Sequence, residues 1–153
     1  MSGRNGHVDS AQLREFVQRV ETELGAAKME LFLESCAKEL AARLLTKTIR
    51  RTPVGQYAHR VGGTLRRGWT AEQQQNVAAY VSSLNVAHGS GIYTIEIVNP
   101  VYYAPYVEYG HRTKNGGWVE GKFMLTISEQ EVQNDAPKIL ERKLQRKLGE
   151  IFK

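Results

Sequence analysis

The sequence has very little cysteine: Cys36 is the only one among 153 residues. A single cysteine excludes an internal disulfide and leaves no second thiolate for a structural zinc site. Its apolar neighbours Phe32, Leu33 and Leu40 predict a buried thiol that packs as a small apolar group. A catalytic thiol would need a base and an electropositive setting. The sequence therefore favours a structural role for Cys36.

Long apolar runs are also missing. Lys, Arg and Glu interrupt every apolar segment, so no stretch approaches the roughly 20 apolar residues of a membrane-spanning helix. The segment Met1 to Asp9 lacks the basic patch and apolar run of a secretory signal. We therefore expect a soluble protein that stays in the cytoplasm where it is made and has no membrane partner.

The sequence lacks the patterns of common catalytic and cofactor sites. There is no Walker loop and no Gly-x-Ser-x-Gly elbow, and no two histidines have the i, i+4 spacing of a helical zinc site. His59, Glu108 and His111 form the best candidate for a metal or hydrolase site, if their two loops meet. Most carboxylates alternate with Lys or Arg along predicted helices, which favours solvated helix faces. We therefore expect that the protein is not an enzyme and that it binds neither a cofactor nor a metal ion.

Acidic residues are the minority, with 16 Asp and Glu against 21 Lys and Arg and a net charge of +5. Such basicity indicates acidic partners, which can be nucleic acid or an acidic protein surface. The segment 50–67 concentrates this charge near Trp69, in Arg50, Arg51, Arg60, Arg66 and Arg67. It could grip a phosphate backbone or dock as a cationic arm onto an acidic protein, and a solvated loop is the third interpretation.

The length fits a single domain, residues 1–153. Helical periodicity begins at a capping box, Asp9 to Gln12, and continues through residue 51, with a break at Gly25 as an option. Pro53 ends the helical part. Residues 52–68 then form a loop rich in glycine and arginine.

Residues 69–121 are expected to form a sheet region with an inserted helix. The helix spans 71–84, and a strand spans 92–98 after a turn at 89–91. A short helix over 102–109 has Pro105 in its first turn, and 111–117 is a polar loop tip. Residues 122–153 form C-terminal helices, the last of which begins near Pro137.

Four segments in this order carry a resemblance to a known family: Thr52-Pro53-Val54-Gly55, the run Gly63 to Trp69, the run Asn99 to Arg112, and Gly121-Lys122-Phe123-Met124-Leu125. The most distinctive piece is Tyr106-Val107-Glu108-Tyr109-Gly110. Together they resemble the tail-component family of long-tailed bacteriophages. The segment 56–61 and the helical stretch after Trp69 depart from the family pattern, which concerns loop geometry.

The resemblance implies an α+β fold in which a long N-terminal helix and C-terminal helices pack on a small, mostly antiparallel sheet, as in tail-terminator and tail-completion proteins. It also implies a virion protein at the neck of a phage or at the collar of a phage-tail-like particle. Such a protein forms a ring at the head-proximal end of the tail tube, hexameric or alternatively dodecameric. Its partners would be the tail tube protein and a sheath, head-completion or connector protein, with DNA passing through the lumen as a further contact.

In this hypothesis the arginine loop and the aromatic segment make the contacts between subunits and with partners, and the four tyrosines divide between core and contact, with the core favoured for at least half of them. The expected contact residues are Arg50, Arg51, Arg60, Arg66, Arg67, Trp69, Tyr102, Tyr103, Tyr106, Glu108, Tyr109, His111, Arg112 and Trp118. Replacing Arg66 and Arg67 by Glu is expected to stop assembly while the monomer stays folded. The alternative is a nucleic-acid-binding protein that contacts DNA through the 50–67 loop.

Overall fold

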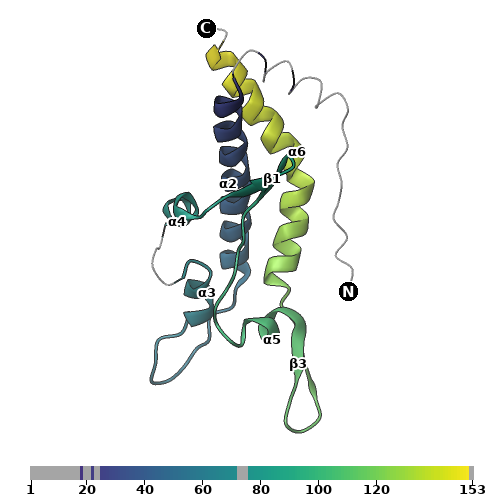
Figure 1. The fold of residues 1–153 in the computed structure, drawn as a ribbon. Coiled ribbons are helices and arrows are strands. Elements are labelled where there is room, and N and C mark those ends of the chain that lie inside the picture. Colours follow the sequence, from purple (N-terminus) through teal and green to yellow (C-terminus); the bar gives the residue numbers. More distant parts are fainter. Residues whose placement is uncertain (1–17, 19–21, 23–24, 72–75, 152–153) are drawn as a thin grey trace. The chain divides into compact units, whose positions relative to one another are not determined.

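A computed structural model describes residues 18, 22, 25–71 and 76–151 of the chain (Figure 1). The chain divides into two compact units, one up to Ser35 and one from Cys36 onward. Helix α2, Ala26–Arg51, contains the boundary. Gly25 precedes it with a φ of 75°, a left-handed conformation that favours glycine. The break expected at Gly25 is therefore present, whereas the expected capping box at Asp9 lies outside the described residues.

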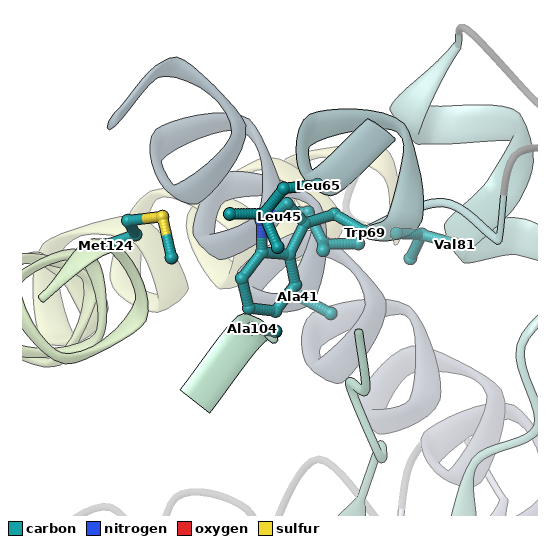
Figure 2. Close-up of a cluster of buried hydrophobic side chains, with 7 residues drawn as sticks. All are labelled: Ala41, Leu45, Leu65, Trp69, Val81, Ala104 and Met124. Atoms are coloured by element: carbon teal, nitrogen blue, oxygen red, sulfur yellow. The ribbon is translucent and has the colours of Figure 1, made fainter. Parts of the chain in front are cut away.

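The core of the second unit lies where α2 meets short segments from the middle of the sequence. It contains Ala41 and Leu45 of α2, together with Leu65, Trp69, Val81, Ala104 and Met124 (Figure 2). Half-buried residues such as Ile95, Ile97 and Tyr103 pack against this cluster. Cys36 is buried at 8% exposure, which confirms the prediction of a packed thiol.

The prediction that residues 52–68 form a loop is wrong for the last five residues, because helix α3 spans Thr64–Gly68. Gly63 allows the turn into this helix with a φ of 95°. Leu65 and Trp69 are four residues apart and both buried, so α3 presents one apolar face to the core. The four-residue spacing of Leu65 and Trp69 was not recognised from the sequence, because glycines and arginines surround it.

The inserted helix is shorter than the predicted span 71–84. Helix α4 covers Val77–Ser83, and the side chain of Asn76 caps it by accepting hydrogen bonds from the N–H groups of Ala78 and Ala79. The turn expected at 89–91 joins β1, Ala87–Gly89, to β2, Ile92–Thr94, in an antiparallel hairpin. The predicted strand thus ends at Thr94 instead of Val98, because β1 offers only three partner residues.

Helix α5, Ala104–Tyr109, matches the predicted short helix and has Pro105 in its first turn. It leads into a second antiparallel hairpin, β3, Gly110–Arg112, and β4, Trp118–Glu120. The predicted loop tip 111–117 was therefore too long, since His111 and Arg112 pair with Val119 and Trp118. The loop proper is 113–117.

The C-terminal part is one helix, α6, Met124–Ile151, with Pro137 in its interior. The predicted start of a separate helix near Pro137 is wrong. An interior proline costs roughly 3 kcal/mol, but Val132, Ala136 and Leu140 form one buried or half-buried stripe through this point. Burial of that stripe keeps the helix continuous.

These elements confirm the α+β class: two long helices, α2 and α6, combine with two small antiparallel hairpins. Helix α5 contacts β3 and the start of α6 (Figure 1). In the described part of the chain, none of the helices combines the length and the apolar character needed to cross a membrane.

Candidate interaction surface

Thr52, which follows the end of α2, is hydrogen-bonded to two residues of the segment Arg66–Trp69. Its side chain has no exposure to solvent. The Oγ1 atom accepts a hydrogen bond from Trp69 Nε1 at 2.8 Å and donates one to the Thr48 carbonyl at 2.7 Å. Its carbonyl accepts two bonds from the Arg66 guanidinium, at 3.2 and 2.7 Å. Thr52 therefore fixes the orientation of α3 on the end of α2.

Asn99 attaches the next segment to the same helix. Its Nδ2 donates to the Leu65 carbonyl at 2.8 Å, and its Oδ1 accepts from the Val101 N–H at 3.1 Å. A Cβ atom at Gly68 would collide with Asn99 Oδ1 and Val101 Cγ2, so glycine is required for this close approach. The Thr-Pro, Arg-x-x-Trp and Asn segments form one hydrogen-bonded scaffold.

Glu108 caps helix α6 from a different helix. Phe123, which precedes α6, has a φ of 47° and no polar side chain with which to bind the free N–H groups. The carboxylate of Glu108 accepts bonds from the N–H groups of Leu125 at 3.0 Å and Thr126 at 2.9 Å, and from Thr126 Oγ1 at 2.8 Å. A negative charge at this end also suits the helix dipole.

Two glycines let the backbone segments around Glu108 approach each other. A Cβ atom on Gly121 would collide with the carbonyl of Glu108, and one on Gly110 would collide with the carbonyl of Val119 and the ring of Trp118. The N–H groups of Lys122 and Phe123 donate to the carbonyls of Val107 and Glu108, at 2.8 and 3.0 Å. The Val-Glu-Tyr-Gly and Gly-Lys-Phe-Met motifs thus form one rigid joint.

Exposed aromatic side chains lie on this joint and on the segments next to it, and we call this set the aromatic face: Tyr102, Tyr106, Tyr109, Trp118 and Phe123, with exposures of 84%, 55%, 62%, 56% and 39%. Tyr106 packs edge-on against His111, with ring centroids 6.0 Å apart. Of the four tyrosines in this segment, only Tyr103 packs against the core. The expectation that at least half of them serve the core was wrong, and tyrosine at such exposure is typical of contact surfaces.

The predicted contact arginines divide by exposure into a half-buried group, Arg51 and Arg66, and an exposed group. Arg51 and Arg66 have partners within the chain: Arg51 pairs with Glu131 and bonds Ser128 Oγ at 3.0 Å, and Arg66 bonds Thr52. Arg50, Arg60, Arg67 and Arg112 are exposed. Arg60 lies 4.0 Å from the centroid of the Tyr57 ring, and Arg67 donates to the Gly62 carbonyl at 3.1 Å. Trp69 and Glu108 are buried and serve the scaffold and the joint.

The candidate constellation of His59, Glu108 and His111 is not assembled. His59 is exposed, the Glu108 carboxylate binds the start of α6, and His111 Nδ1 lies 3.4 Å from the Tyr106 carbonyl. Among the described residues no group of three or more His, Cys, Asp or Glu side chains could hold a metal ion.

Ion pairs join α2 to α6 in the second unit, and they could not be predicted from the alternation of charges along the sequence. Lys47 and Arg51 both bind Glu131, with Lys47 Nζ at 2.8 Å, and Lys143 binds Glu39 at 3.0 Å. The Lys47 hydrogen bond, more than the opposing loss of solvent, holds the pKa of Glu131 below its usual range. Burial tends to raise the pKa of Glu39, but hydrogen bonds from Lys143 and Arg43 bring it below the usual value.

Comparison with known proteins adds one match. A family model described as "Bacteriophage HK97-gp10, putative tail-component" matches residues 14–110 of the chain. No curated protein and no solved structure matches it. The matched region contains the scaffold around Thr52 and the Val107–Gly110 half of the joint, together with Tyr102 and Tyr106, whereas Gly121–Met124 lie outside it.

Proposed function

The chain belongs to the HK97-gp10-like family of bacteriophage tail components, and from this premise we propose that it is a non-enzymatic subunit of a ring at the head-proximal end of the tail tube. In this role the ring completes the tail and joins it to the head, or forms the collar of a phage-tail-like particle. The protein assembles in the host cytoplasm and ends in the neck of the particle. Its partners are further copies of itself, the tail tube protein and a sheath, head-completion or connector protein.

The aromatic face is the observation that supports this proposal. Large side chains are exposed on a joint whose backbone is fixed by Glu108, Gly110 and Gly121. Exposed aromatic residues on a rigid base lose little conformational entropy on binding and bury a large area. The arrangement therefore suits a permanent protein contact.

The test uses variants of the aromatic face. Tyr102→Ser combined with Tyr106→Ser removes exposed rings and leaves the core intact, so the protein should fold with an unchanged melting temperature. It should be lost from purified tails, as measured by immunoblot, and the tails should lack their neck density in electron microscopy. Leu31→Ser, which removes another exposed apolar side chain at 66% exposure, is the matched control. Normal necks in the tyrosine variant, or wild-type protein absent from the neck, would overturn the proposal.

The same preparation tests the alternative of direct nucleic-acid binding. A protein that grips phosphates through Arg50, Arg60 and Arg67 binds DNA with a steep dependence on salt. A ring subunit that uses the aromatic face shows little such binding. Gel shifts of the purified protein at two salt concentrations distinguish the two, and a triple Arg→Gln variant identifies the loop as the source of any binding.

A further inference from the structure

The segment Ile92–Val98, here called the open edge, has the burial pattern of a strand beyond the end of β2. Tyr93, Ile95 and Ile97 are half-buried, and the two isoleucines pack against the core. The alternate side chains of Ile92, Thr94, Glu96 and Val98 are exposed, Ile92 at 67% and Val98 at 55%. The alternation places one face on the protein and the other in solvent.

Beyond Thr94, the backbone of the open edge has few hydrogen-bond partners among the described residues. Sheet pairing ends where Thr94 faces Ala87, and β2 has β1 as its one neighbour in the sheet. Leu84, Asn85 and Val86, which lie between α4 and β1, do not continue the ladder along Ile95 to Ile97. Among residues 25–71 and 76–151, no backbone hydrogen bond joins Ile95, Glu96, Ile97 or Val98 to another segment.

Such an edge is a template for a further strand. Exposed edge strands pair with other chains unless proline, charge or a covering segment prevents it. The open edge contains no proline, and Glu96 is its one charged residue. Asn99 and Pro100 follow, and Pro100, which has no N–H group, limits the edge on that side. In the part of the chain that the structure describes, Ile95 to Val98 therefore have no proline and no paired strand, and Glu96 carries their one charge.

From this edge and the β3–β4 hairpin, we infer that the open edge of one copy pairs with strand β3 of a second copy by strand addition. The hairpin is two-stranded, so β3 has β4 as its one neighbour in the sheet, and the other edge of β3 has no strand partner in the described part of the chain. A two-stranded hairpin is marginal alone, and a third strand stabilises it. Arg112 is exposed on β3, and Lys114 lies in the loop beside it. Their positive charge complements Glu96 on the open edge, which selects this occupant.

The inference rests on the proposed function, because it names the contact by which successive ring subunits associate. The two surfaces are different segments of the chain, so the contact is heterologous, and repetition of it can close a ring. A symmetric pair of open edges would instead stop at a dimer.

Cysteine cross-linking in purified tails tests the contact directly. Residues opposite each other on paired strands have Cα atoms roughly 4.5–5.5 Å apart, within the range of a disulfide. Full-length protein with Glu96→Cys and Arg112→Cys should form a ladder of disulfide-linked multimers on oxidation. Each single variant should give no ladder, and Cys36 is buried and common to all variants.

Other outcomes overturn the inference. The first is that tails contain the double-cysteine protein in normal amount but show no ladder. The second is that Glu96→Cys alone forms dimers. The third is that the cysteine introduced by Glu96→Cys forms a disulfide with another tail protein. The first outcome leaves the proposed function intact, because the protein is still in the tail. Absence of the wild-type protein from tails would refute both.

Charge reversal provides the second measurement. Glu96→Arg and Arg112→Glu alone should each lose incorporation into tails while the melting temperature of the isolated protein stays unchanged. The combined variant restores opposite charges and should recover incorporation. The pairing is contradicted if both single variants are defective and the combined variant is not incorporated into tails either. It is also contradicted if both single variants are incorporated normally.

Discussion

The indole Nε1 of Trp69 donates a 2.8 Å hydrogen bond to Oγ1 of Thr52, and both residues are buried, at 4% and 0% exposure. This bond joins the two segments through which the sequence first resembles its family. It links the end of α2 to the end of α3, and the Arg66 guanidinium binds the carbonyl of the same threonine. The pattern Thr-Pro followed by Leu-Arg-x-x-Trp thus has a structural basis in this chain.

Removing either partner of this bond should destabilise the protein, and the effects should be coupled. Thr52→Val leaves the buried indole N–H without an acceptor and should cost about 1–3 kcal/mol. Trp69→Phe should cost a similar amount from the lost bond and the smaller ring. Because the double variant loses the bond only once, its cost should be less than the sum. Urea denaturation of the four proteins measures this, and strict additivity would contradict the coupling.

Arg66 and Arg67 should respond differently to substitution although they are adjacent. Arg66→Ala loses two charge-assisted bonds to the Thr52 carbonyl and should lower the free energy of unfolding by about 1–3 kcal/mol. Arg67→Ala is the matched control, since its exposed side chain bonds only the Gly62 carbonyl, and it should change stability by about 0.5 kcal/mol or less. Equal losses in thermal or urea unfolding would refute this distinction.

The expectation that Arg66→Glu with Arg67→Glu leaves the monomer folded therefore needs revision. The first substitution removes scaffold bonds, so a defect in assembly would not separate folding from contact. Arg60→Glu with Arg67→Glu changes two exposed arginines and is the better test of the basic loop.

Glu108 should be required for the start of α6. Glu108→Gln keeps the size of the side chain but replaces one acceptor oxygen by a donor, so the N–H of Leu125 or Thr126 loses its partner. Loss of a cap and of a charge near the helix dipole should cost about 1–2 kcal/mol. Glu120→Gln, an exposed carboxylate on β4, is the control and should have little effect. Equal stability of both variants in urea denaturation would remove the capping role.

The sequence predicted the elements that have strong helical periodicity or a clear proline or glycine signal at their ends. Helical spacing up to residue 51, with an optional break at Gly25, agrees with α2, and Pro105 marked α5 correctly. The α3 helix was missed because its five residues include two arginines and follow two glycines. The continuity of α6 through Pro137 was missed because tertiary burial of its apolar stripe outweighs the local preference of proline.

For the candidate surface, the sequence identified important residues, but it did not show whether each residue serves the scaffold or a contact with a partner. It selected Trp69, Glu108 and Arg66 as contact residues because aromatic and charged side chains are common at interfaces. Their hydrogen bonds connect positions between 14 and 18 apart in sequence, and no local pattern specifies such pairs. Thr52 and Asn99 were recognised as parts of a motif, but their hydrogen-bonding role follows only from the fold.

The ion pairs of Glu131 should make stability depend on pH in a direction that follows from its pKa. The hydrogen bond from Lys47, with that from Arg51, lowers the pKa of Glu131 in the folded protein below the ordinary value of 4.5. A lowered folded-state pKa contributes stability above the unfolded value, and this contribution is lost as pH falls through the folded value. Wild type should thus lose more stability than Glu131→Gln between about pH 7 and about pH 3. Thermal unfolding across this range measures it, with Glu129→Gln as the control for loss of one exposed charge on the same helix. Added salt should reduce the difference, and a pH profile of Glu131→Gln as steep as that of wild type would show that these pairs contribute nothing.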